Sequence, residues 1–330
     1  MHRWTSLETT PDALTPCVAT FGNFDGVHRG HQTIVNAVIT AARRHDVPAV
    51  AVTFEPHPVT VFHPERATEL IAPGRLRDEI LESIGLDGLL VLHFDREFAQ
   101  QLPQDYIVTT FVEGLRIKAL VVGADTQGFG RDYTGDVDLL RELGAKHGFE
   151  VIVLDDVGDG ERWSSSAVRH LLADGEVAQA ATILGRPHRL VGEVVHGDHR
   201  GRELGYPTAN MSPDSLGLIP ADGVYAGWLT RLDRPDEDPE RTMPAAISVG
   251  TNPTFEGRRA RRVESYVLDR TDLDLYGETV MVEFVEHIRP TLKFDSVDDL
   301  LEAMSGDVAR ARDVLRSAIV PPAPPVSHGP

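Results

Sequence analysis

The chain has 330 residues, which is long for a single hydrophobic core and ample for two domains. Its hydrophobic content of 41% and charged content of 25% are ordinary for a water-soluble globular protein. The formal net charge of -19 disfavours a nucleic-acid partner, and no segment approaches the roughly eighteen apolar residues that a membrane span needs.

The N-terminal segment lacks the apolar stretch of a secretory signal. The single cysteine, Cys17, excludes an internal disulfide and fits a reducing compartment. We therefore expect a cytoplasmic protein with no membrane or nucleic-acid partner.

Short β-branched runs alternate with amphipathic stretches over residues 17–157. The runs predict buried parallel strands at Cys17–Phe24, Ala49–Phe54, Gly88–Phe94, Ala119–Gly123 and Glu150–Leu154. The stretches between them predict helices at Thr33–His45, Leu76–Gly85, Gln104–Gly114 and Val137–Gly148. This alternation is typical of an α/β doubly wound, Rossmann-like sheet, in which ligands bind at the carboxyl ends of the strands.

Two further helices are expected at Ser165–Asp174 and Glu176–Gly185, and the pattern then changes. Short alternating segments between glycine and proline turns predict a small antiparallel barrel or sandwich from Leu190–His196, Val224–Leu232, Ala245–Val249, Val263–Leu268 and Val280–Ile288. A helix over Val297–Ala318 follows. We expect domains at residues 1–186 and 187–320, with a disordered, proline-rich tail at 321–330.

The string T-F-G-N-F-D-G-V-H-R-G-H, residues 20–31, lies where the first strand ends and a helix begins. Gly22 and Gly26 permit a tight turn and close approach of a ligand. A helix N-terminus attracts an anion, and His28 and His31 are spaced so that both can point into that site. A metal site formed by these histidines with Asp25 is an alternative, although no further ligand with suitable spacing is evident.

A second polar segment, Gly192–Asn210, combines several glycines, Gly197 among them, with Arg200 and Arg202. That composition suits a loop that wraps phosphates. At its end, Thr208 and Asn210 lie two residues apart, so in extended chain both side chains point to one side. Hydroxyl and amide oxygens suit Mg²⁺, which completes its shell with water and nucleotide phosphates. The alternative is that this P-T-A-N sequence is a simple turn.

These motifs resemble those of a known family. G-x-F-D-G-x-H-x-G-H is similar to the H-x-G-H signature of nucleotidylyltransferases, and the fuller string resembles bacterial bifunctional riboflavin kinase/FAD synthetases. Further segments match in order at Thr53–Pro58, Val121–Asp125, Ser164–Arg169 and Leu184–Pro187. The resemblance covers essentially residues 15–315.

The resemblance implies two reactions that use ATP. Riboflavin is phosphorylated to FMN, and an adenylyl group is then transferred from ATP to FMN, giving FAD and pyrophosphate. Riboflavin, FMN, FAD, ATP, ADP and pyrophosphate are thus the expected partners, with Mg²⁺ accompanying ATP. FMN and FAD would be substrate and product rather than prosthetic groups. The oligomeric state stays open, a homo-oligomer included.

For adenylyl transfer, the resemblance implies that His28 and His31 contact the ATP phosphates and that Arg169 supplies donors to the departing pyrophosphate. It further implies nucleotide or flavin contacts by Gly22, Phe24, Asp25, Gly26, His57, Phe62, Tyr106, Asp125, Arg162, Ser165 and Ser166. A structural hydrogen bond is the alternative for His57, and core packing for Phe62 and Tyr106. The loop Gly123–Gly130 departs from the family pattern, because it is one residue longer and lacks its first aromatic residue.

For phosphorylation, the resemblance assigns Glu264 to deprotonate or orient the ribityl 5′-hydroxyl. It supports Thr208 and Asn210 as metal ligands, and it implies nucleotide contacts by Gly197, Arg200, Arg202, Asn252 and Arg289. The alternatives are a riboflavin kinase with impaired adenylylation, a flavin-binding regulatory protein without turnover, and a metal-dependent hydrolase.

Overall fold

The computed structural model describes residues 1–155, 163–197, 204–253 and 259–318, and for 67–69, 251–253 and 259–260 it describes the backbone alone. The chain forms two compact units, residues 1–164 and 165–330. The predicted tail at 321–330 lies outside the described residues.

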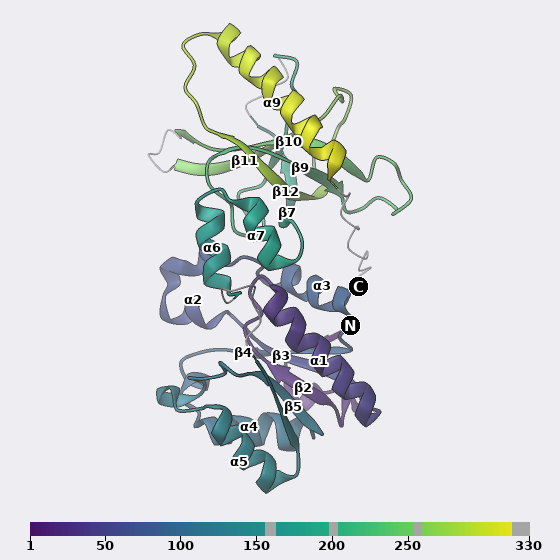
Figure 1. The fold of residues 1–330 in the computed structure, drawn as a ribbon, viewed down its shortest axis with the longest axis vertical. Helices are drawn as coiled ribbons and strands as arrows, with labels where there is room; N and C mark the ends of the chain where they lie inside the picture. The colour runs from purple at the N-terminus through teal and green to yellow at the C-terminus, as the bar shows by residue number, and fades with distance from the viewer. Residues whose placement is uncertain (156–162, 198–203, 254–258, 319–330) are drawn as a thin grey trace. The chain divides into compact units, whose positions relative to one another are not determined.

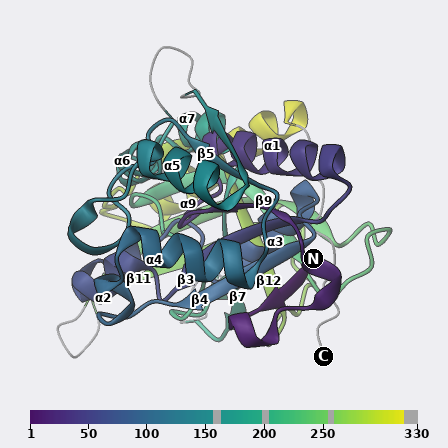
Figure 2. The same ribbon diagram turned by 90° about the horizontal axis from the view of Figure 1, so that it is seen from below.

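The first unit is built on a parallel sheet with strand order β1-β4-β3-β2-β5-β6. Its strands are β1 (His2–Trp4), β2 (Val18–Phe21), β3 (Ala49–Glu55), β4 (Gly88–His93), β5 (Ala119–Gly123) and β6 (Glu150–Leu154). Strand β1, absent from the sequence prediction, adds an edge to β4, where the N-terminal segment lies in Figure 2.

Helices cover both faces of this sheet, as the continuous apolar strands require. The helices of this unit are α1 (Arg29–His45), α2 (Pro58–Phe62), α3 (Arg75–Ile84), α4 (Pro103–Ile107) and α5 (Val137–His147), and a π-helical segment, Val108–Gly114, continues α4. Helix α1 packs on β2, β3 and β5. The opposite face buries Phe111, Leu120 and Leu140 in one core, so the sheet lies between α1 and the α4–α5 layer (Figure 1).

The second unit is a closed antiparallel barrel with strand order β10-β11-β8-β7-β12-β9. Its strands are β7 (His188–Val195), β8 (Ala209–Met211), β9 (Gly223–Arg231), β10 (Thr242–Pro253), β11 (Arg259–Val267) and β12 (Thr279–Pro290). Helix α9 (Val297–Ser317) packs on β9, β10 and β12, as Figure 1 shows. The predicted α/β sheet followed by a small barrel and a C-terminal helix is therefore confirmed.

Helices α6 (Ser165–Ala173) and α7 (Val177–Leu184) group with the barrel. Helix α7 packs on β7 and β12, and the Ala221 amide donates to the Leu172 carbonyl over 2.8 Å. The boundary between the two structural units therefore falls between residues 164 and 165, earlier in the chain than the sequence-based domain boundary at 186. Residue 186 as the boundary between two activities stays a prediction.

Candidate active sites

The loop between β2 and α1 has an unusual backbone. Phe24, Gly26 and Val27 have φ values of 51°, 78° and 40°. A β-branched residue such as Val27 rarely adopts a positive φ, so its neighbours must hold it there. A Cβ at Gly26 would also lie 3.1 Å from Ile71 side-chain atoms, so a larger residue would have to displace Ile71 as well as adopt the positive φ that favours glycine.

Asp25 supplies part of that constraint. Its buried Oδ1 accepts hydrogen bonds from the amides of Ile71 (2.9 Å) and Ala72 (3.0 Å). The carboxylate thereby ties the β2–α1 loop to the segment before α3. Among the described residues, no group of three His, Cys, Asp or Glu side chains is arranged to hold a metal ion. Asp25 thus has a structural task in this loop, and the alternative metal site gains no support.

His28 and His31 lie together at the N-terminus of α1. Their rings stack with centroids 3.8 Å apart, and Nδ1 of His28 caps the helix by accepting from the His31 amide over 3.4 Å. In a neutral imidazole the accepting nitrogen carries no proton, so Nε2 of His28 is the donor. Gly30 makes room for this ring, because a Cβ there would lie 3.0 Å from His28 Cε1.

His31 is held neutral. Its burial, with a smaller contribution from neighbouring His28, lowers the pKa of His31 well below the ordinary value. Its Nδ1 is buried and has no hydrogen-bond partner among the described residues. A buried, unsatisfied polar atom at a helix N-terminus fits an absent ligand that would complete its hydrogen bonds. The predicted grouping of these two histidines at the helix N-terminus matches the geometry, and the binding of an anion there stays a prediction.

His57 lies at the carboxyl end of β3 and caps α2. Its Nδ1 accepts from the Val59 amide over 3.1 Å, which is the structural hydrogen bond that the sequence left as an alternative. Two residues earlier, Glu55 faces Arg77 of α3 (Nη2 to Oε1, 2.8 Å). Sequence reasoning did not single out Arg77. Its two acceptors on β3, Thr53 and Glu55, are alternate residues of the T-F-E-P-H-P motif, and that spacing was the available signal.

Aromatic side chains gather around the carboxyl ends of β2, β3 and β4. The rings in mutual contact, with centroids 5.3 to 6.4 Å apart, belong to Phe21, Phe54, Phe62, Phe94, Phe98, Tyr106, Phe111 and Phe129. Phe62 lies at the exposed rim, whereas Tyr106 is in the core. Burial raises the pKa of Tyr106 far above its ordinary value, and its hydroxyl has no partner among the described residues.

The irregular loop after β5 contributes to this aromatic group. Gly128 and Gly130 have φ values of 72° and 73°, and Phe129 between them packs on Phe21 with centroids 5.3 Å apart. A Cβ at Gly135 would collide with the Phe129 ring at 2.6 Å. The extra residue therefore leaves one aromatic side chain of the loop in place. Asp125 is exposed beside Gly123 at the start of this loop.

The serine-rich segment lies at the start of the second unit. Ser165, Ser166 and Arg169 are on α6, while Arg162 is outside the described residues. Trp163, the last tryptophan of the first unit, lies under the Arg29 guanidinium at 5.5 Å. The segment leading to Ser165 thus adjoins the loop that carries His28, and the contacts of Arg169 with nucleotide stay a prediction.

In the barrel, the candidate metal ligands and the candidate base come together. Strands β8 and β11 pair Asn210 with Glu264. The Thr208 hydroxyl donates to Glu264 Oε2 at 3.4 Å, and Asn210 Nδ2 donates to the Thr208 carbonyl at 3.2 Å. A pocket beside this group is lined in part by Thr208, Ser265 and Tyr276. Hydroxyl, amide and carboxylate oxygens in one place fit a hard cation such as Mg²⁺.

The other residues predicted to contact nucleotide in the barrel are Gly197, Arg200, Arg202, Asn252 and Arg289. A Cβ at Gly197 would lie 2.5 Å from the Asn210 amide group, so a larger residue there would have to displace the Asn210 side chain. Arg200 and Arg202 lie outside the described residues, as does the side chain of Asn252. Arg289 binds Asp307 of α9 through two hydrogen bonds of 2.7 and 2.6 Å. These contacts of Arg289 join β12 to α9, and a nucleotide contact stays a prediction.

Comparisons with known proteins agree with this arrangement. The FAD synthetase family model matches residues 10–168 and the riboflavin kinase family model matches residues 184–315. A bifunctional riboflavin kinase/FMN adenylyltransferase of Escherichia coli K12 is 37% identical over 298 residues, covering 90% of this chain and 92% of that protein. The protein of the same description from Haemophilus influenzae is 35% identical over 309 residues, with 92% and 96% covered.

A similar solved structure is that of a protein described as a macrolide-efflux protein from Streptococcus pneumoniae. It has a TM-score of 0.82 at 33% identity, covering 95% of this chain and 99% of that one. In the part of this chain that the structure describes, no helix combines the length and apolarity needed to cross a bilayer.

A doubly wound parallel sheet followed by a closed barrel, each matched by a family model of its own, places the chain in the class of transferases of phosphate-containing groups. The chain belongs to the family of bifunctional riboflavin kinase/FMN adenylyltransferases.

Proposed function

We propose that this chain phosphorylates riboflavin to FMN in the barrel and adenylylates FMN to FAD in the first unit, using ATP and Mg²⁺ in the cytoplasm. The observation that carries the kinase half is the placement of Thr208, Asn210 and Glu264 in one group, with Thr208 Oγ1 3.4 Å from Glu264 Oε2. The family models for both activities, matching separate stretches of the chain, support the second half.

In the kinase reaction, Glu264 accepts the proton of the ribityl 5′-hydroxyl. The hydroxyl oxygen then bonds to the γ-phosphorus of ATP, the bond to the bridging oxygen breaks, and ADP leaves. Thr208 and Asn210 would hold Mg²⁺, which neutralises phosphate charge when bound. The Thr208 hydroxyl donates a hydrogen bond to Glu264 and accepts one from Asn210 Nδ2 at 3.4 Å, so its oxygen keeps one further lone pair for a cation.

In the adenylylation reaction, an FMN phosphate oxygen attacks the α-phosphorus of ATP and pyrophosphate leaves. This needs no covalent intermediate on the chain, so orientation and charge stabilisation supply the rate. The N-terminus of α1 and the Nε2 proton of His28 are suited to the ATP phosphates. His31 remains neutral and contributes a hydrogen bond rather than a charge.

The aromatic group around Phe54, Phe62 and Phe129 suits a flat isoalloxazine ring. The unsatisfied Tyr106 hydroxyl lies beneath it. Because Phe129 reaches this group despite the loop's extra residue, we favour intact adenylylation over a kinase with an impaired first unit.

The test is a purified chain incubated with riboflavin, ATP and Mg²⁺, with the flavins separated by chromatography. We expect FMN first and then FAD. Glu264→Gln should abolish FMN formation while FAD still forms from supplied FMN. Formation of FMN alone would support the impaired-adenylylation alternative, and binding of riboflavin without turnover would support a regulatory protein.

A further inference from the structure

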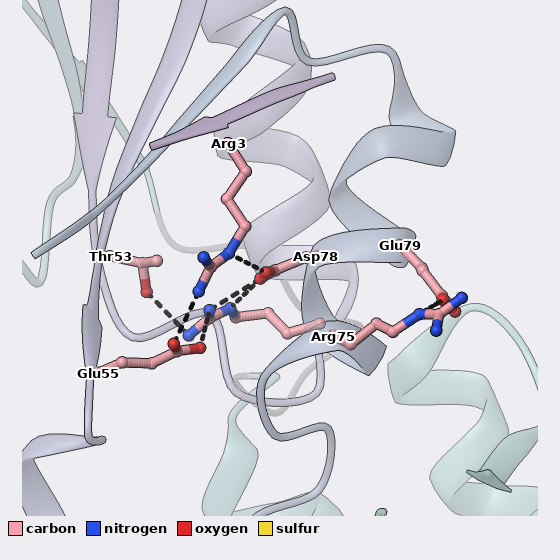
Figure 3. A network of polar contacts seen from close by, with 7 residues as sticks. Arg3, Thr53, Glu55, Arg75, Asp78 and Glu79 are labelled. Atoms are coloured by element: carbon pink, nitrogen blue, oxygen red, sulfur yellow. Dashed lines mark hydrogen bonds and ion pairs between the residues drawn. The ribbon is translucent and has the colours of Figure 1, made fainter. Parts of the chain in front are cut away.

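Four charged side chains form a closed ring beside the carboxyl end of β3 (Figure 3). Arg77 donates to Glu55 Oε1 and to Asp78 Oδ1, each over 2.8 Å. Arg3 of β1 completes the ring through Glu55 Oε2 at 2.8 Å and Asp78 Oδ2 at 2.9 Å. Each guanidinium therefore binds both carboxylates, and the formal charges of the four groups cancel.

Arg77 is the most deeply buried of the four side chains in this ring. The residue is only 4% exposed, and a further bond runs from its Nη1 to the hydroxyl of fully buried Thr53 at 3.3 Å. A guanidinium with several directed donors fixes the orientation of its acceptors more strictly than an ammonium group does. Removing it would leave the Glu55 and Asp78 carboxylates with the single guanidinium of Arg3 between them, and that guanidinium is partly exposed to solvent.

The ring acts on a strand that leads directly to the candidate adenylylation site. Side chains alternate along β3, so Thr53 and Glu55 face Arg77 while Phe54 faces the aromatic group on the opposite side. The chain then passes Pro56 to His57, which caps α2. Holding Thr53 and Glu55 thus sets where Phe54 and His57 lie.

Helix α3 is also attached to the phosphate-binding loop. Asp25 binds the amides of Ile71 and Ala72, which lie shortly before the helix begins at Arg75. Gly74, just before the helix, lies near Glu55, since a Cβ there would be 3.8 Å from Glu55 Oε1. Helix α3 and the segment before it therefore contact both the loop that carries His28 and the carboxyl end of β3.

We propose that Arg77 is a positioning residue for adenylyl transfer, which holds the segment 53–58 at a set place relative to the loop 22–31. It touches neither ATP nor FMN and acts through Glu55 and Thr53. This inference rests on the proposed function of the first unit, because it assumes that these two segments contact the substrates.

The test compares Arg77→Met, Arg77→Lys and a control, Arg75→Met, in the full-length chain. Arg75 lies on the same helix, and its 69% exposed side chain pairs with Glu79. Steady-state rates of FAD formation are measured at varied concentrations of FMN and of ATP. The rate of FMN formation from riboflavin by the same sample serves as an internal reference. Circular dichroism and melting curves establish folding.

We expect Arg77→Met to lower kcat for FAD formation about tenfold or more and to raise KM for FMN, with FMN formation unchanged. Arg77→Lys should recover part of the loss, and Arg75→Met should match the parent. A purely structural role would lower the melting temperature and the active fraction while KM for FMN stayed constant, and that result would overturn the proposal. So would a folded Arg77→Met chain with parental kcat and KM.

Should Arg77→Met fail to fold, the same kinetic measurements on Arg3→Met test the proposal. This substitution opens the ring from its exposed side and keeps Arg77 buried. A smaller change in kcat and KM of the same sign supports the proposal, and parental values refute it. The parent chain separates the two levels of inference. If it makes no FAD, the proposed function of the first unit fails and this inference with it; if it makes FAD, only the role of Arg77 is at stake.

Discussion

Gly30 shows how the absence of a single side chain can shape a site. The His28 imidazole occupies the space beside Gly30, with Cε1 and Nδ1 at 3.0 and 3.1 Å from the position of a Cβ. Such contacts are too close for a methyl group, so an alanine must displace the ring that caps α1 and stacks on His31. The glycine in H-x-G-H thus leaves free the space that the imidazole two residues earlier occupies.

We therefore predict that Gly30→Ala lowers FAD formation from supplied FMN about tenfold or more, because small displacements of a positioning group carry large kinetic costs. FMN formation from riboflavin should stay at the parental rate. The measurement is chromatography of both flavins. Gly306→Ala is the control, since nothing lies within 4 Å of a Cβ there. A Gly30→Ala chain with parental FAD formation would show that His28 tolerates displacement.

At the scale of elements, the hydrophobic pattern predicts a strand or helix whose own sequence carries the signal. It does not predict an element that forms only by pairing with a segment distant in sequence. Ala119–Gly123 and Glu150–Leu154 are strands as expected, because each is a short run rich in apolar and β-branched residues. Strand β5 is buried as predicted, whereas β6 lies at the edge of the sheet and is only partly buried. Strand β1 escaped prediction because its three residues become a strand only by pairing with β4 and burying Trp4.

The candidate sites divide in the same way. His28 and His31 share one helix turn, so their grouping follows from spacing alone. The approach of Thr208 to Glu264 depends on the register between β8 and β11, which alternating side chains do not determine when the two strands are far apart in sequence. Arg77 was missed for that reason too, since its acceptors Thr53 and Glu55 lie on another element.

The pairing of β7 with β12 buries a cluster of ionisable groups. Arg189 lies opposite Glu283, and His188 opposite Phe284. Burial raises the pKa of Glu283 to about 7, although Arg189 and Arg186 oppose the shift. Burial lowers the pKa of His188 to about 4, and its Nε2 donates to the Leu218 carbonyl over 2.6 Å. Folding therefore favours the neutral forms of both residues.

These shifts give a signed pH dependence. The folded chain keeps the Glu283 proton up to about pH 7, whereas the unfolded chain loses it near pH 4.5. The stability that Glu283 contributes is therefore full below pH 4.5 and is lost as the pH rises through 7. His188 acts oppositely: its contribution is present above pH 6.5 and is lost as the pH falls through 4.

We predict that Glu283→Gln removes the first effect and keeps the second. Relative to the parent, the free energy of unfolding of the variant should rise by about 3 kcal/mol between pH 4.5 and 7.5. Urea unfolding at several pH values measures it, with Trp4→Phe and Trp163→Phe introduced so that Trp228 reports on the second unit. Glu286→Gln, at a partly exposed position on the same strand where the carboxylate pairs with Arg310, is the control. Parallel pH profiles for parent and Glu283→Gln would contradict the prediction.

At the scale of the whole molecule, each unit has a hydrophobic core of its own. Phe111 is fully buried among the side chains between the parallel sheet and α4. Phe284 is fully buried in the barrel, where it contacts Tyr225 with ring centroids 5.3 Å apart. If each activity belongs to one unit, damage to one core should leave the other activity intact.

We predict that Phe111→Ala lowers the temperature at which FAD formation is lost and that Phe284→Ala does so for FMN formation. Truncating a buried phenylalanine costs about 3–5 kcal/mol, which corresponds to roughly 6–20 °C for a unit of this size. Samples are heated in steps, cooled, and assayed for FAD formation from supplied FMN and for FMN formation from riboflavin. In each variant one inactivation curve should move while the other stays at the parental temperature. Curves that move together in either variant would show that the two units unfold as one, because the loss of a single core would then have removed both activities.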